Sequence, residues 1–140
     1  MSISDYQTEF DPPSTPITAT GYSVNKLKNP SNGDITLNTI PIYLQVVADA
    51  TFVSGGSTTL VVTLETASDE AFTSPVTLMT TATIAKASLV NGYEIINQIV
   101  PHGAKKYLRV KYTVATGPFT AGSVTARLMS NSGSRTNYPQ

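Results

Sequence analysis

The sequence has 140 residues, no cysteine, and nine basic and nine acidic side chains, which give a formal net charge of zero at pH 7. This length suits a single domain, and the absence of cysteine excludes disulfide bonds and thiolate metal sites. A neutral balance argues against nucleic-acid binding, which needs a basic surface, and against electrostatic attachment to a membrane. Charged residues make up 13% of the chain, about half the usual share of roughly 25%, so Thr, Ser, Asn and Gln must provide the solubility.

No targeting or membrane-spanning segment is visible. Every apolar run is shorter than the ~20 residues that an α-helix needs to cross a bilayer. The first residues, MSISDYQTEFDPP, lack the basic region and apolar core of a secretory signal. We therefore expect a protein that is made and assembled in the cytoplasm.

Residues 1–16 are expected to form an extended N-terminal arm. Pro12 and Pro13 restrict the backbone and favour extended conformations before them. Tyr6 and Phe10 are the only large side chains of this segment. Two interpretations stay open. The arm is a flexible terminus with one short edge strand, or it orders when its aromatic side chains dock on a neighbouring protein.

The rest of the chain alternates between strand patterns and turn signals. Strands are expected at residues 17–24, 35–40, 42–48, 58–66, 76–83, 93–100, 107–115 and 122–129. About eight strands at intervals of roughly 8–12 residues, with no convincing helical periodicity, indicate an all-β fold. Because an open sheet of this size would expose an apolar face, we expect an antiparallel β-sandwich over residues 17–130, followed by a flexible tail at 131–140.

The connection at residues 67–75 has the pattern of a single helical turn. Ser68 can cap such a turn, with Asp69 and Glu70 in its first positions. Phe72 would then pin the loop to the core.

The clearest alternation in the chain lies in residues 105–128, KKYLRVKYTVATGPFTAGSVTARL. From Tyr107 to Ala115 every second side chain is apolar, and the alternation returns after Gly122. Two such strands joined by a Gly/Pro loop predict an antiparallel hairpin. The inward face would hold the set Leu108, Val110, Tyr112 and Val114, and the outward face Arg109, Lys111 and Thr113.

Residues that could carry chemistry are few, and no cofactor, metal or catalytic residue is expected. His102 is the only histidine and lies between a proline and a glycine, so we expect a surface loop residue. Asp69 and Glu70 are adjacent and do not match a calcium-binding loop. The glycines do not form a phosphate-binding motif. We therefore do not expect an enzyme.

Two surface features suggest binding instead. Lys105, Lys106, Arg109 and Lys111 form a modest basic cluster, which is either a solvated face or a contact for an acidic patch on a protein partner. Tyr107 and Phe119 are the rings most expected to be exposed, and they are the weak basis of an alternative function as a carbohydrate-binding or tail-spike module.

Three stretches carry a resemblance to a known family: VVTLETASDEAFTSPVTL (61–78), LVNGYEI (89–95) and KKYLRVKYTVATGPFTAGSVTARL (105–128). The sequence resembles the small capsid cement, or decoration, proteins of short-tailed bacteriophages of the Bordetella phage type. The resemblance implies a jelly-roll β-sandwich on the outer capsid surface of the virion, which clamps neighbouring subunits of the major capsid protein. It also implies self-association, with a homodimer as the first expectation and a homotrimer as the second, and it transfers no catalytic residue.

The loop at Gly117 and Pro118 lies in the most family-specific stretch. It is either a rigid turn that fixes strand register or a tip that contacts a neighbouring subunit. Together with the arm and the basic cluster it gives the candidate capsid or oligomer contacts, which are Tyr6, Phe10, Pro12, Pro13, Arg109, Lys111, Gly117, Pro118 and Phe119.

Overall fold

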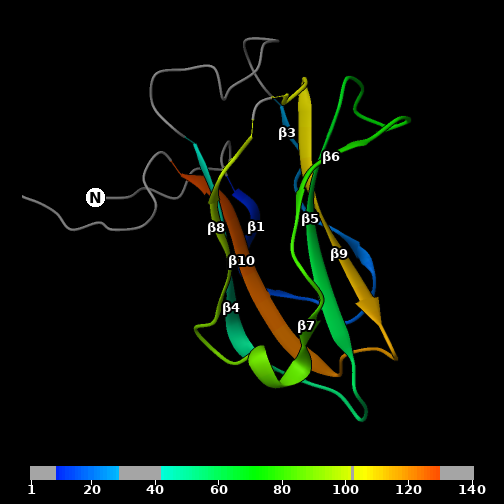
Figure 1. Cartoon of the computed structure of the whole chain (residues 1–140), viewed down its shortest axis with the longest axis vertical. Helices are drawn as coiled ribbons and strands as arrows, with labels where there is room; N and C mark the ends of the chain where they lie inside the picture. The colour runs from blue at the N-terminus through cyan, green and yellow to red at the C-terminus, as the bar shows by residue number, and fades with distance from the viewer. Residues whose placement is uncertain (1–8, 29–41, 102, 130–140) are drawn as a thin grey trace, which may run out of the picture.

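The computed structural model describes residues 9–28, 42–101 and 103–129, and it is an all-β sandwich of two antiparallel sheets (Figure 1). The predicted fold class is therefore confirmed. The predicted strand at 35–40, His102, Tyr6 and the tail after Met129 lie outside the described residues. Within these ranges the helical structure is one short 3-10 helix, η2 (Lys86–Ser88), and no helix there is long and apolar enough to span a membrane.

The two sheets differ in their number of strands. The four-stranded sheet has the order β1-β10-β4-β8 and is formed by β1 (Glu9–Pro16), β4 (Tyr43–Val53), β8 (Glu94–Ile99) and β10 (Ala121–Met129). The six-stranded sheet has the order β2-β9-β5-β6, with β3 also beside β9 and β7 also beside β5. Its strands are β2 (Gly21–Tyr22), β3 (Leu27–Lys28), β5 (Thr59–Ala67), β6 (Val76–Thr80), β7 (Ile84–Ala85) and β9 (Tyr107–Ala115).

The connectivity is that of one long hairpin rolled into a sandwich. β1 pairs with β10, β2 and β3 with β9, β4 with β8, and β5 with β6 and β7, so the chain folds back on itself at the loop after β5. Rolling this hairpin brings β10 beside β4 and β9 beside β5. If the short strands β2/β3 and β6/β7 are each counted as one interrupted strand, the result is the eight-stranded jelly roll.

The predicted hairpin of residues 105–128 is wrong in its pairing. β9 lies in the six-stranded sheet and β10 in the four-stranded sheet, so the Gly117–Pro118 loop crosses between the sheets. The inward face was predicted correctly, since Leu108, Val110 and Tyr112 are all buried. Alternation reports which face of a strand is buried, but it does not report which strand lies beside it.

The described part of the predicted N-terminal arm is the short edge strand that one interpretation expected, but this strand belongs to the sandwich. This strand, β1, hydrogen-bonds along β10 at the edge of the four-stranded sheet. Phe10 is completely buried in the core cluster. The sandwich therefore begins no later than Glu9, because the core needs the side chain that Phe10 supplies.

The core lies between the sheets and follows the period-two pattern of the long strands. Its fully buried apolar side chains include Leu44, Val46 and Ala48 of β4, Leu60, Val62 and Leu64 of β5, Val110 of β9, and Val124 and Ala126 of β10. Complete burial of one such Val or Leu side chain contributes about 1.5–3 kcal/mol. With no disulfide, this burial and the sheet hydrogen bonds hold the fold.

One corner of the core is built around a pair of aromatic rings. Phe52 and Phe119 meet edge to face, with centroids 4.9 Å apart and ring planes at 77°. Gly122 packs under Phe52, and a Cβ atom there would lie 2.5 Å from the ring. Gly122 also has a φ of +134°, so both space and backbone conformation require glycine.

Candidate interaction surface

Arg109 is the best-defined charged side chain on the outer face of the six-stranded sheet. It lies opposite Glu65 in the β5–β9 register, and its Nε atom donates a hydrogen bond of 2.8 Å to Glu65 Oε1. Its guanidinium carbon is 3.7 Å from the ring centroid of Tyr22 and 4.2 Å from that of Phe72. We call these four residues the Arg109 clamp.

The clamp changes the interpretation of Arg109 as a partner contact. The side chain points away from the core, as predicted, but it is only 8% exposed. Its charge is already paired with Glu65, and its flat faces are used by aromatic rings. Arg109 therefore stiffens the surface, and it is not a free basic group.

The loop after β5 forms one side of the clamp. Phe72 is 4% exposed and adopts a φ of +53°, a left-handed conformation that is costly for a bulky residue. Phe72 does pin this loop, as predicted, but it packs on Arg109 within the clamp and is not part of the core cluster between the sheets. The strain of this backbone conformation is offset by burying the ring against Arg109.

The cap of this loop is Asp69, where Ser68 was predicted. The Asp69 carboxylate accepts hydrogen bonds from the Thr73 hydroxyl at 2.7 Å and from the Thr73 backbone N–H at 3.3 Å. These bonds favour the ionised form and lower the pKa of Asp69. The segment is a turn and not a helix.

Exposed apolar groups lie at one side of the clamp, and they include its own Tyr22. Tyr22 is 51% exposed although Arg109 supports it from one side, and the nearby Val24 is 66% exposed. The ammonium group of Lys111 is 6.0 Å from the Tyr22 ring centroid, and that of Lys26 is 5.8 Å from the Phe72 centroid. We call Tyr22, Val24, Lys26 and Lys111 the Tyr22 patch.

The Tyr22 patch combines features of a protein-binding surface. A large ring is held in one position, which reduces the entropy that it would lose on binding. Lys111 lies beside the Tyr22 ring and Lys26 beside the Phe72 ring, where it also donates to the carbonyl of Glu70. Both positive charges would favour carboxylates on a partner. Lys111 was a predicted contact residue, whereas Tyr22 was missed because its support comes from Arg109, 87 positions later in the sequence.

Only part of the loop between β9 and β10 is available at the surface. Gly117 and Pro118 are exposed, and Gly117 has a φ of +91°. Phe119, in contrast, is 2% exposed, and its N–H donates to the carbonyl of Thr18. Phe119 is therefore wrong as an exposed contact, because it fills the corner beside Phe52.

This burial also removes the basis of the carbohydrate alternative. That hypothesis needed two exposed rings, and Phe119 is buried while Tyr107 is only half-buried. In the N-terminal segment, Phe10 is likewise unavailable, Pro12 is half-buried, and Pro13 is exposed on β1.

A buried carboxylate joins the two sheets at the edge formed by β1 and β2. Asp11 is fully buried, and it accepts hydrogen bonds from the Val24 N–H at 2.8 Å and from the Tyr112 hydroxyl at 2.5 Å. Burial raises the pKa of Asp11, although both hydrogen bonds oppose the shift and the charge of Glu9 adds to it. Burial, followed by the charge of Asp11, also raises the pKa of Tyr112.

The described residues give no cluster for a metal site. Across 9–28, 42–101 and 103–129, no three His, Cys, Asp or Glu side chains lie close enough together to hold an ion.

Comparison with other proteins identifies the family. No curated protein matches the chain. The model of the Bbp16 family, however, matches residues 13–128, which include nearly all of the sandwich. The chain therefore belongs to the Bbp16 family, a Bordetella phage protein family.

Proposed function

We propose that this phage protein is a capsid cement protein, which binds the outer surface of the capsid and links neighbouring subunits of the major capsid protein. The observation that carries the proposal is the Tyr22 patch, an exposed ring supported by Arg109 on a rigid sheet. Membership of the Bbp16 family supports a role in a phage. The resemblance of residues 61–78, 89–95 and 105–128 to cement proteins supports the more specific role.

The Tyr22 patch would act as the anchor of each contact. An aromatic ring that is already fixed loses little conformational freedom when a partner covers it. Lys26 and Lys111 would meet carboxylates at the rim of the interface, where they improve the rate and specificity of association more than its affinity. If each protein molecule touches two subunits, or associates with a second copy, the separate weak contacts act together through multivalency.

The partners follow from this role. They are the major capsid protein and the protein itself, as a homodimer or, second, a homotrimer. The protein would lie on the outer capsid surface of the virion. Neither nucleic acid nor a membrane is a proposed partner, because the net charge is zero.

The contribution of the patch is tested by Tyr22→Ala in binding to purified capsids assembled without this protein. We expect Tyr22→Ala to weaken binding by tenfold or more, since removing a central aromatic anchor commonly costs 2 kcal/mol or more. Val90→Ala is the matched control, because Val90 is 47% exposed on the loop before β8. Melting curves of both variants exclude loss of fold. Equal binding by Tyr22→Ala and the unchanged protein would reject the patch as the capsid contact.

A further inference from the structure

The two long edges of the sandwich differ in whether hydrogen bonds join the two sheets there. At the edge formed by β1 and β2, hydrogen bonds join the sheets: Val24 N–H to Asp11, Asn25 N–H to the Phe10 carbonyl at 2.9 Å, and Tyr112 to Asp11. At the opposite edge, β6 and β8 are the terminal strands of the two sheets within residues 9–28, 42–101 and 103–129. A strand at the end of a sheet presents backbone donors and acceptors along its outer side.

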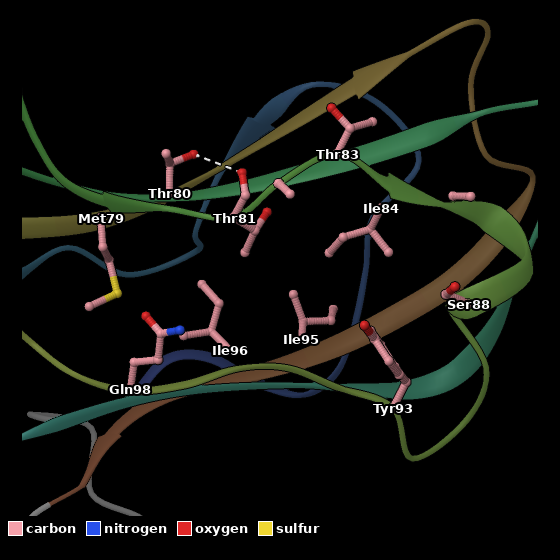
Figure 2. Close-up of a pocket in the computed structure, with 12 residues that line it drawn as sticks. Met79, Thr80, Thr81, Thr83, Ile84, Ser88, Tyr93, Ile95, Ile96 and Gln98 are labelled. Carbon is pink, nitrogen blue, oxygen red and sulfur yellow. Dashed lines mark hydrogen bonds between the residues drawn. The ribbon is translucent and has the colours of Figure 1, made fainter.

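A cavity of about 550 Å³ lies between β6, β7 and β8 at this second edge. Figure 2 shows Ile84 on one wall and Ile95 and Ile96 on the other, all pointing into it. Ile95 and Ile96 are 9% and 5% exposed and make their wall apolar. We call this cavity the edge groove.

The edge groove carries no charge. None of the twelve residues that line it is acidic or basic. The segments that form it do contain charged residues, but these point elsewhere: Lys86 donates to the carbonyl of Ser54, and Glu94 accepts from Gln45 and Asn97. The polar residues of the lining, among them Thr80 and Thr81, are uncharged. The groove is thus complementary to an uncharged ligand.

Apolar side chains continue beyond the groove along both terminal strands. Val76 of β6 is 44% exposed and Ile99 of β8 is 52% exposed, and within the groove Tyr93 is 38% exposed. Exposed apolar groups along the terminal strands of a sheet are typical of surfaces that another polypeptide covers.

We propose that the edge groove binds an extended, uncharged segment of a neighbouring phage structural protein, which adds to the sandwich as a strand. The backbone of the segment would hydrogen-bond to β6, and its apolar side chains would rest on Ile95 and Ile96, the arrangement of β-strand addition. This contact is separate from the Tyr22 patch, and assigning the segment to a structural protein rests on the proposed function.

The ligand is tested with overlapping synthetic peptides that tile the structural proteins of the phage, added to the isotope-labelled full chain and followed by NMR. We expect an uncharged peptide to shift the amide signals of β6, β7 and β8 and to slow their hydrogen exchange, while those of β1 and β2 are unaffected. The proposal is overturned if no peptide binds, or if the changes fall on other strands. Protection of β8 that grows with protein concentration in the absence of peptide would assign the groove to a second copy and also overturn it.

A charge placed in the groove provides the matched test. Thr83 and Gln98 line the groove and are exposed, so Thr83→Lys and Gln98→Lys should leave the fold intact. Each should weaken peptide binding by tenfold or more, because the covered ammonium group would lack a partner. Thr18→Lys, at an exposed position before β2, is the control and should bind as the unchanged protein does. Unchanged peptide binding by both groove variants would contradict the proposal.

The same variants separate this inference from the proposed function. If the unchanged protein decorates capsids and Thr83→Lys decorates them equally well, the groove is not the contact and the cement function stands. If the unchanged protein does not decorate capsids, the cement function fails, and the peptide experiment still decides what the groove binds.

Discussion

The hydroxyl of Tyr112 donates a 2.5 Å hydrogen bond to the buried carboxylate of Asp11, which joins β9 of one sheet to β1 of the other. Asp11 also accepts the Val24 N–H, so one side chain holds together three segments at the edge formed by β1 and β2. A carboxylate in this position is costly to ionise, because burial removes its water.

The first prediction concerns the pH dependence of stability. The pKa of Asp11 is raised in the folded state. The protonated side chain therefore contributes fully to the stability of the fold below the unfolded-state pKa of 3.8, and this contribution is lost as the pH rises through the raised pKa. In Asp11→Asn, the amide can accept from Val24 and donate to Tyr112 without a charge. We expect the free energy of unfolding of Asp11→Asn, relative to the unchanged protein, to increase as the pH rises above 3.8, as measured by urea unfolding.

Asp69→Asn is the control for this experiment. The pKa of Asp69 is lowered by the Thr73 hydrogen bonds. Its contribution to stability is therefore present above the unfolded-state pKa of 3.8 and is lost as the pH falls through the lowered pKa. The free energy of unfolding of Asp69→Asn, relative to the unchanged protein, should therefore decrease as the pH rises. Parallel profiles for Asp11→Asn and the unchanged protein would show that Asp11 does not titrate differently in the two states.

The second prediction concerns the Arg109 clamp. Both side chains of the Arg109–Glu65 pair are 10% exposed, so Arg109→Met should destabilise the protein by about 3–5 kcal/mol through the unpaired Glu65 charge. The double variant Arg109→Met with Glu65→Gln should regain a large part of this loss. Urea unfolding of the single and double variants measures the coupling. A loss below 1 kcal/mol in the single variant would contradict the pairing.

The third prediction concerns the aromatic corner. Gly122→Ala should destabilise by about 2–4 kcal/mol, because the methyl group meets the Phe52 ring and the positive φ disfavours alanine. Gly56→Ala is the matched control, since a Cβ atom at Gly56 would meet nothing within 4 Å. Thermal unfolding of both variants gives the comparison, and an equal effect at the two glycines would disagree with the packing described.

The fourth prediction distinguishes a core strand from an arm. Phe10→Ala should cost about 3–5 kcal/mol, the usual loss when a large ring is removed from a core. Pro13→Ala, in the exposed part of the same strand, should change stability far less. A small loss in Phe10→Ala would restore the interpretation of residues 1–16 as an arm outside the sandwich.

The sequence predicted the positions of the strands better than the pairing between them. Leu60, Val62 and Leu64 repeat every second position, and all three are fully buried. The same repeat suggested that β9 and β10 form a hairpin, but the signal is identical whether a strand pairs with its neighbour in sequence or crosses to the other sheet. Burial of Phe119 in the connecting loop favours the crossing between the sheets. The sequence alone does not show whether an aromatic side chain in a loop points inward or outward.

The Arg109 clamp could not be predicted from the sequence. Glu65 and Arg109 are 44 positions apart and meet only because β5 and β9 pair in one register. Tyr22 and Phe72 come from two further segments. The role of Asp11 could not be predicted either, since its two hydrogen-bond donors, Val24 and Tyr112, lie 13 and 101 positions later.

The central claim is tested most directly by adding the purified protein to capsids assembled without it and measuring the bound copies per capsid and the temperature of capsid disruption. A cement protein should saturate at a fixed copy number set by capsid symmetry, and the saturated capsids should withstand a higher temperature than bare ones. Absence of saturable binding, or saturation with no gain in capsid stability, would contradict the cement function.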